Sequence, residues 1–219
     1  MSLTVELKEY AVKHGIDLIG VTSAKAFELD GLDKPLTEPR TYLENAQSIV
    51  VYGFYSGTPL TNPTRLGAPC GRLAPGLKAI PAMQEYCHEV IKECLNEKGY
   101  NAAKRERRQE MPLKLLAVKA GIGMYGKNSL VHAEGFGSWI NLGCVITDAP
   151  LETEERPYKI SDCGDCTACI EACPTNAIKA PYKVMPSLCL AKWLDGAPIP
   201  RQLREKVGNR LTGCEICQE

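Results

Sequence analysis

The amino-acid sequence predicts an α+β fold divided into two unequal domains. Its 219 residues suit two domains better than one and leave ample length for a buried core. Stretches typical of helices and of strands follow one another over the first 150 residues, whereas seven of the eleven cysteines lie after residue 160. The acidic stretch from Leu151 to Pro157 marks a change of composition. We therefore expect an α+β domain at residues 1–152 and a cysteine-rich domain at residues 153–219.

The first elements are a helix and two strands. Residues 3–14 carry one apolar helical stripe, and Gly15 follows where a left-handed cap is needed. Short β-branched and aromatic runs at residues 16–22 and 48–54 predict strands. The segment between these strands is rich in loop-forming residues.

A loop and a long helix come next. Residues 56–81 repeat Gly and Pro without periodicity, which indicates either a loop facing a substrate or cofactor or an ordinary surface excursion. Pro81 then opens a helix whose apolar residues recur at i, i+3, i+4 and i+7 and which ends at Gly99. Cys87 and Cys94 lie on that apolar stripe, so we expect both to pack in the core.

The first domain closes with a short helix and a hairpin. Residues 104–108 form the only dense basic cluster, which could contact RNA phosphates but is better explained as a solvated loop. Residues 113–120 predict a helix closed by Gly121. Residues 129–132 and 139–147 are typical of two strands, and we expect them to pair as a hairpin.

Charge and hydropathy exclude several classes of protein. Lys and Arg number 26 against 26 Asp and Glu, so no global field attracts nucleic acid or an anionic membrane. No apolar run reaches the ~18 residues of a spanning helix, and the first residues lack the features of a signal peptide. We expect a cytoplasmic protein with reduced thiols, which makes metal ligation a better explanation of the cysteine pairs than disulfides.

The cysteine spacing predicts iron–sulfur chemistry. Cys163, Cys166, Cys169 and Cys173 follow the order Cys-x2-Cys-x2-Cys-x3-Cys-Pro that binds 4Fe–4S clusters in bacterial-type ferredoxins. Structural zinc also uses Cys-x2-Cys pairs, but this tight order is not its usual spacing. We therefore expect a ferredoxin-like domain that transfers electrons. The small residue Gly164 allows backbone N–H groups to approach inorganic sulfide.

The same order predicts a second cluster, because the fourth cysteine of such a run ligates the other cluster. Cys173, Cys189, Cys214 and Cys217 complete one set of four. The three cysteines before them lack a fourth ligand. A mirrored motif would place that ligand at position 221, two residues past Glu219.

Three explanations of this missing ligand stay open. In the first, which we favour, the chain continues to a further Cys-Pro in its natural form. Alternatively Cys70 or Cys144 folds over as the ligand. In the third, the cluster keeps three protein ligands and leaves one iron open to a small molecule, or contains three irons.

The second half of the chain resembles the epoxyqueuosine reductase family. The resemblance rests on residues 120–130, 137–151, the ferredoxin run and residues 180–218, and it extends to the iron–sulfur half of reductive dehalogenases. It implies a nitroreductase-like N-terminal α/β sandwich that holds a corrinoid and receives single electrons from two 4Fe–4S clusters. In that family the epoxide oxygen is removed from a modified nucleoside of tRNA.

Two departures limit what the resemblance implies. The family has an Asp-Ser/Thr-Ala-Pro segment whose Asp donates a proton, but here Gln109, Glu110 and Met111 precede Pro112. Glu110 is the one candidate catalytic acid. The family's Tyr-Ala-x-Gly-x-Asp-Tyr-His segment is also missing from the Gly- and Pro-rich region. We therefore expect a substrate other than epoxyqueuosine.

The glycines after the short helix predict a cofactor-facing loop. Gly121, Gly123 and Gly126 match a dinucleotide fingerprint, but they close a helix instead of opening one, which excludes that fold. They allow the backbone to approach a flat cofactor, with Lys127 and Asn128 as polar partners. The residues expected to bind this cofactor are Gly121, Gly123, Gly126, Lys127, Asn128, Ser138 and Trp139. Cobalamin is the favoured cofactor and FMN the second choice; a Gly-rich turn with Lys127 in solvent is the alternative.

These observations predict an iron–sulfur oxidoreductase. Electrons would pass from a ferredoxin- or flavodoxin-like donor through the 4Fe–4S clusters to a corrinoid-type or flavin site. The substrate would be a small molecule or a modified nucleoside, without a membrane partner. The alternatives are a non-catalytic electron carrier, a corrinoid-reactivating partner, or an RNA-modification subunit that uses residues 104–108.

Overall fold

The computed structural model describes residues 1–25, 38–57, 60–61, 72–73, 79–104, 111–153, 163–194 and 196–219. It divides the chain into two compact units. Unit 1 comprises Met1–Tyr55, Ile80–Met124 and Ile140–Lys159, and unit 2 comprises Ser56–Ala79, Tyr125–Trp139 and Ile160–Glu219. The change of unit at Ile160 lies near the expected boundary at residue 152. Unit 2 also takes in two earlier segments, so the boundary itself stays a prediction.

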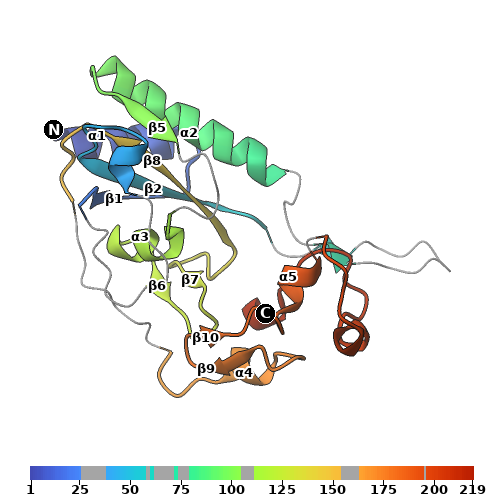
Figure 1. Ribbon diagram of the computed structural model, residues 1–219. Helices are drawn as coiled ribbons and strands as arrows, with labels where there is room; N and C mark the ends of the chain where they lie inside the picture. Colours follow the sequence, from blue (N-terminus) through green and yellow to red (C-terminus); the bar gives the residue numbers. More distant parts are fainter. Residues whose placement is uncertain are drawn as a thin grey trace. The chain divides into compact units, whose positions relative to one another are not determined.

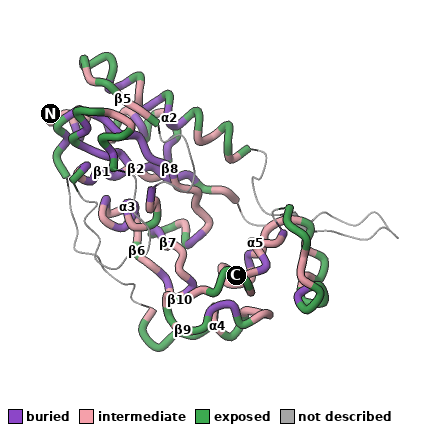
Figure 2. The backbone as a smooth tube through the Cα atoms, in the orientation of Figure 1, coloured by how far each residue is buried: buried purple, intermediate pink, exposed green. Residues whose placement is uncertain are grey.

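An antiparallel sheet forms the centre of unit 1. It contains β1 (Leu18–Ser23), β2 (Ser48–Tyr55), β8 (Ile140–Thr147) and β5 (Ala102–Lys104), in that order. β2 and β8 pair along their whole length, from Ser48 opposite Thr147 to Tyr55 opposite Ile140. Every residue of β2 except Tyr55 is buried, and Figure 2 shows buried positions along this strand. A strand covered on both faces reads as a continuous apolar run, which is why it was recognisable in the sequence.

Helices cover both faces of this sheet (Figure 1). α1 (Leu3–Lys13) and α2 (Ala79–Glu97) pack on one face, and α3 (Leu113–Lys119) packs against β1, β2 and β8. All three begin and end within two residues of the predicted limits. Gly15, Gly99 and Gly121 follow their ends with φ of 81°, 83° and 75°, the left-handed caps that the sequence predicted. The short 3-10 helix η1 (Pro39–Thr41) precedes β2.

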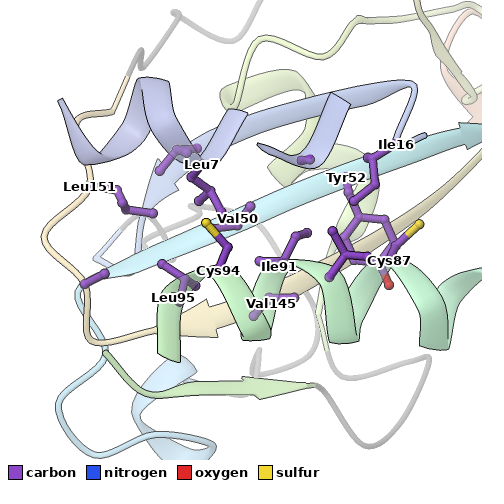
Figure 3. Packing of buried hydrophobic residues seen from close by; sticks show 14 of the residues in the cluster. Leu7, Ile16, Val50, Tyr52, Cys87, Ile91, Cys94, Leu95, Val145 and Leu151 are labelled. Carbon is purple, nitrogen blue, oxygen red and sulfur yellow. The ribbon is translucent and has the colours of Figure 1, made fainter. Parts of the chain in front are cut away.

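The core under α1 and α2 is continuous and apolar (Figure 3). Leu7 from α1, Ile91 and Leu95 from α2, and Val50 and Val145 from the sheet are all fully buried. Cys87 and Cys94 belong to the same cluster, at 0 % and 4 % exposure, and the pKa of both thiols is raised by burial. The prediction that these two cysteines pack in the core is confirmed.

The predicted hairpin is wrong. β7 (Val131–His132) pairs with β6 (Met124–Tyr125), whereas β8 lies between β2 and β5 in the large sheet. The eight-residue register with β2 buries the apolar half of β8, which a two-residue partner could not do. The hairpin was expected because the two strands are close in the sequence. Strand pairing depends instead on the apolar surface area that the pair buries.

Unit 2 consists of short elements. β3 (Leu60–Thr61) pairs with β4 (Arg72–Leu73), and β9 (Ile178–Ala180) pairs with β10 (Lys183–Val184). α4 (Ala168–Glu171), α5 (Leu190–Leu194) and the 3-10 helices η2 (Arg201–Lys206) and η3 (Ile216–Gln218) carry the remainder. A small core of Leu190, Leu194 and Leu203 packs with Trp193, Ile199, Val207 and Cys214. None of the helices that the structure describes combines the length and apolar character needed to cross a bilayer.

Candidate iron–sulfur centre

Three predicted ligands lie on a short turn and the helix that follows it. Gly164 has a φ of 45°, in the left-handed region, and the N–H of Cys166 donates to the carbonyl oxygen of Cys163 at 2.8 Å. Cys169 lies in α4. Burial raises the pKa of the Cys169 thiol, and the thiols of Cys163 and Cys166 raise it further. The three sulfurs that the spacing groups together are therefore neighbours in the fold.

Cys173 follows α4 and receives hydrogen-bond donors at its sulfur. The N–H of Ala177 donates to Sγ at 3.2 Å, and the Thr175 hydroxyl lies 3.7 Å from the same atom. Asn176 has a φ of 49°, which turns the chain back toward the sulfur. Burial alone would raise the pKa of this thiol, but the hydrogen bonds outweigh it and hold the pKa below its ordinary value. The site favours the thiolate, which is the form that binds iron.

The remaining thiols belong to the end of the chain. Cys189 directly precedes α5, Cys214 packs against the small core, and Cys217 lies in η3. Burial raises the pKa of the Cys217 thiol to about 12, and the nearby thiols of Cys214, Cys189, Cys169 and Cys173 raise it as well. α4 also contacts η3. The fold thus brings the ends of the two cysteine groups together at Cys217.

This donor set fits 4Fe–4S clusters in its chemistry. Seven half-buried or exposed thiols stand within one unit, without the disulfides that would compete for them. Cys173 has the N–H and O–H donors that stabilise ligating thiolates. Within the described ranges, no three His, Cys, Asp or Glu side chains form a closed metal site on their own. The cluster ligands accordingly remain a prediction from their spacing and proximity.

The alternative fourth ligands receive no support. Cys144 is 4 % exposed, and its sulfur lies 4.0 Å from the sulfur of Met111 in unit 1. That position is typical of a thiol used as an apolar core residue. Cys70 lies outside the described residues.

Lys127 and Asn128 contact the cysteine segments directly. Nζ of Lys127 donates to the carbonyl oxygens of Gly164 at 2.6 Å and Cys166 at 2.8 Å. Nδ2 of Asn128 donates to the carbonyl oxygen of Cys217 at 2.9 Å. The polar ends expected to bind a flat cofactor therefore have partners within unit 2. Their role in cofactor binding stays a prediction. It would require Lys127 and Asn128 to replace these hydrogen bonds with contacts to the cofactor.

The other residues predicted to bind the cofactor belong to separate segments of the chain. Gly121 ends α3, and Gly126 is buried beside His132, since a Cβ on Gly126 would meet its Nε2. Ser138 is 8 % exposed, and the Trp139 carbonyl accepts hydrogen bonds from the Ser56 N–H at 2.9 Å and hydroxyl at 3.1 Å. Gly123, which lies between Gly121 and Gly126 in the sequence, is partly exposed. Cofactor binding at these residues stays a prediction.

The candidate acid and most of the basic cluster cannot be placed. Glu110 and residues 105–108 lie outside the described residues. Lys104, the described member of the basic cluster, pairs with Glu85 at 2.9 Å. The surface ion pair agrees with the solvated loop that we favoured, and contact with RNA stays untested.

Arg210 is a further candidate that no sequence motif indicates. Its Nη1 donates to the Val207 carbonyl at 3.2 Å. Its Nε is buried and finds no hydrogen-bond acceptor among the described residues. Although burial raises the pKa of the neighbouring Cys214 thiol, the charge of Arg210 opposes that rise. The available signal in the sequence was an arginine four residues before a predicted ligand. A buried donor without an acceptor suits a negatively charged cluster.

Comparisons with known proteins agree with this reading of the cysteines. Residues 162–219 match the family model of a 4Fe-4S double cluster binding domain. The epoxyqueuosine reductase of Bacillus subtilis (strain 168) is 30% identical over 248 residues, covering 99% of this chain and 62% of the reductase. The chain therefore spans less than two thirds of that relative's length.

Solved structures extend the likeness to the fold. A crystal structure of epoxyqueuosine reductase with an epoxyqueuosine-modified tRNA-Tyr stem loop superimposes with a TM-score of 0.85 at 27% identity, covering 99% of this chain and 64% of the other. A reductive dehalogenase structure, described as suggesting a B12-dependent mechanism, has a TM-score of 0.59 at 15% identity and covers 96% and 30%. The predicted resemblance to epoxyqueuosine reductases and the mixed helix and sheet fold with a 4Fe-4S domain are confirmed.

Proposed function

We propose that this chain, which is similar over its whole length to epoxyqueuosine reductases, is an iron–sulfur reductase. The observation that carries the proposal is the grouping of seven thiols within unit 2, over the residues that match a 4Fe-4S double cluster binding domain. A 4Fe–4S cluster exchanges one electron at a time. Two clusters can therefore relay single electrons from a ferredoxin- or flavodoxin-like donor to an acceptor.

The ligands are proposed from the spacing. Cys163, Cys166 and Cys169 serve one cluster, and Cys173, Cys189, Cys214 and Cys217 serve the other. Bound there, the clusters supply one-electron redox chemistry. The chain's own residues stabilise the thiolate of Cys173 through Ala177 and Thr175.

The acceptor and substrate form the finer part of the proposal. The resemblance favours a corrinoid in a nitroreductase-like first domain. We propose that the loop from Gly121 to Asn128, with Ser138 and Trp139, binds it. A modified nucleoside in tRNA is the substrate class to test first, because one structural relative is described with an epoxyqueuosine-modified stem loop. We expect a substrate other than epoxyqueuosine; if that substrate carries an epoxide, removing its oxygen would consume two electrons and two protons and release water. The clusters would deliver those electrons in two steps.

Anaerobic reconstitution tests the proposal. We expect the protein to bind ~8 iron and ~8 sulfide per chain if both cubanes assemble, and to show reduced-cluster electron paramagnetic resonance (EPR) signals. Titrations with cobalamin and with FMN, read by visible spectra, then identify the acceptor. Turnover of a modified tRNA stem loop with reduced ferredoxin would establish the reductase. Clusters without cofactor binding or turnover would instead favour the electron carrier, and a chain that retains zinc but no iron would contradict the proposal.

A further inference from the structure

Two neighbouring residues reach the two opposite ends of the ligand sequence. Lys127 contacts the turn that carries Cys163 and Cys166 through the carbonyl oxygens of Gly164 and Cys166. Asn128 contacts the last predicted ligand through the carbonyl oxygen of Cys217. These ends are separated by about fifty residues in the sequence. One dipeptide therefore contacts two segments that carry ligands of different predicted clusters.

The turn that presents this dipeptide is held on several sides. The N–H of Gly126 donates to Leu130 at 2.8 Å. Oδ1 of Asn128 accepts from the N–H of Leu130 at 3.1 Å and lies 3.2 Å from Nε2 of His132. Asn128 is 5 % exposed. These contacts leave the Asn128 amide a single orientation, with Nδ2 toward Cys217.

The backbone of Lys127 is also fixed. Its carbonyl oxygen accepts a hydrogen bond from the N–H of Tyr182 at 2.9 Å. Tyr182 has a φ of 66°, in the left-handed region, at the turn between β9 and β10. Lys127 is thus held by its backbone on one side and its ammonium group on the other. A side chain anchored in this way keeps its charge at a defined place beside the ligand turn.

We propose that Lys127 and Asn128 are positioning residues for the clusters and that the Lys127 charge raises the reduction potential of the cluster on Cys163, Cys166 and Cys169. This inference rests on the proposed iron–sulfur function. A thiolate-ligated cluster carries net negative charge, and reduction adds one more electron to it. A fixed ammonium group stabilises the reduced form more than the oxidised form. Asn128 acts by holding the backbone of Cys217.

The experiment is an anaerobic redox titration of the reconstituted full chain, followed by EPR. Lys127→Met should lower the potential of one cluster, with the equilibrium constant for its one-electron reduction falling on the order of tenfold, which corresponds to about 59 mV. Lys127→Arg keeps the charge and N–H donors, so its cluster potential should stay close to the wild-type value. Lys206→Met, at an exposed position of η2 in the same unit, is the matched control for loss of one charge.

Asn128→Leu tests the second contact. It should change the EPR line shape or lower the iron content of the cluster that includes Cys217 and leave the other cluster's potential near the wild-type value. If Lys127→Met assembles poorly and has a low iron content, a normal iron content in Lys127→Arg supports the positioning role. Iron loss shared by Met and Arg variants would contradict it.

The outcomes separate this inference from the proposed function. Iron-loaded Lys127→Met with both potentials at wild-type values would overturn the inference while leaving the reductase proposal intact. A shift as large in Lys206→Met would also overturn it, because the effect would then be a general one of net charge. Failure of the proposed function shows instead as wild-type protein that takes up no iron.

Discussion

The backbone N–H of Ala177 donates a hydrogen bond to the sulfur of Cys173 at 3.2 Å. The Thr175 hydroxyl lies 3.7 Å from the same sulfur. Together these donors favour the thiolate of Cys173 before any metal binds. The thiol of Cys217 is in the opposite situation, since burial and its neighbours raise its pKa to about 12.

These pKa directions predict an order of alkylation in the metal-free protein. Because the pKa of Cys173 lies below its ordinary value and that of Cys217 well above, Cys173 is ionised at a pH where Cys217 is still protonated. Iodoacetamide at pH 8 should therefore modify Cys173 before Cys217, measured by peptide mass spectrometry. Thr175→Val should shift the Cys173 rate profile to higher pH. In urea, Cys173 and Cys217 should react at equal rates. Equal rates in the folded protein would show the prediction to be wrong.

Removing one predicted ligand should remove one cluster. Cys189→Ala is expected to halve the iron content of the reconstituted protein, from ~8 to ~4 atoms, because its set of four thiolates loses a member. Cys87→Ala is the matched control, since that cysteine is fully buried in the core of unit 1. The control should keep its iron. Cys189→Ala with wild-type iron and EPR signals would mean that this ligand is misassigned.

Gly126 should tolerate no side chain. A Cβ there would meet Nε2 of His132 and lie 2.8 Å from Oδ1 of Asn128. Gly126→Ala is expected to lower the free energy of unfolding by about 1–3 kcal/mol and to weaken cluster retention. Gly135→Ala is the control: its φ of 77° costs about 1 kcal/mol, but a Cβ there meets open space. Urea unfolding and iron retention in air distinguish them. Equal effects of both substitutions would contradict the steric account.

Arg210→Met should lower the potential of the cluster that includes Cys214. The arginine places a charge near that thiol and has a buried Nε without an acceptor among the described residues. A cluster sulfur can accept that hydrogen bond. Arg204→Met, an exposed arginine of η2 whose Nε already binds the Ile199 carbonyl at 3.0 Å, is the control. Redox titration should show a shift for Arg210→Met only, and equal potentials in the two variants would reject this role.

Much of unit 1 was predictable because its signals are local. The apolar stripes of α1 and α2, with Gly15 and Gly99 after them, follow from helical periodicity and from the conformation that ends a helix. Even so, the predicted partner of β8 was wrong, since eight residue pairs with β2, most of them buried, outweigh the shorter connection to β7. Pairing depends on area buried across the fold, which no local pattern contains.

The amino-acid sequence alone predicted iron–sulfur chemistry, because cysteine spacing indicates which thiols can wrap one cluster, and residues 162–219 match a 4Fe-4S double cluster binding domain. It also determined the order of the main helices and buried strands. Only the tertiary structure decided what Lys127 and Asn128 contact, and that Nε of Arg210 is buried with its charge near Cys214. Lys127 and Asn128 join segments far apart in the chain, and the surroundings of Arg210 depend on how unit 2 packs. Such contacts depend on packing, because the surrounding unit decides which space and which hydrogen-bond partners are available to a side chain.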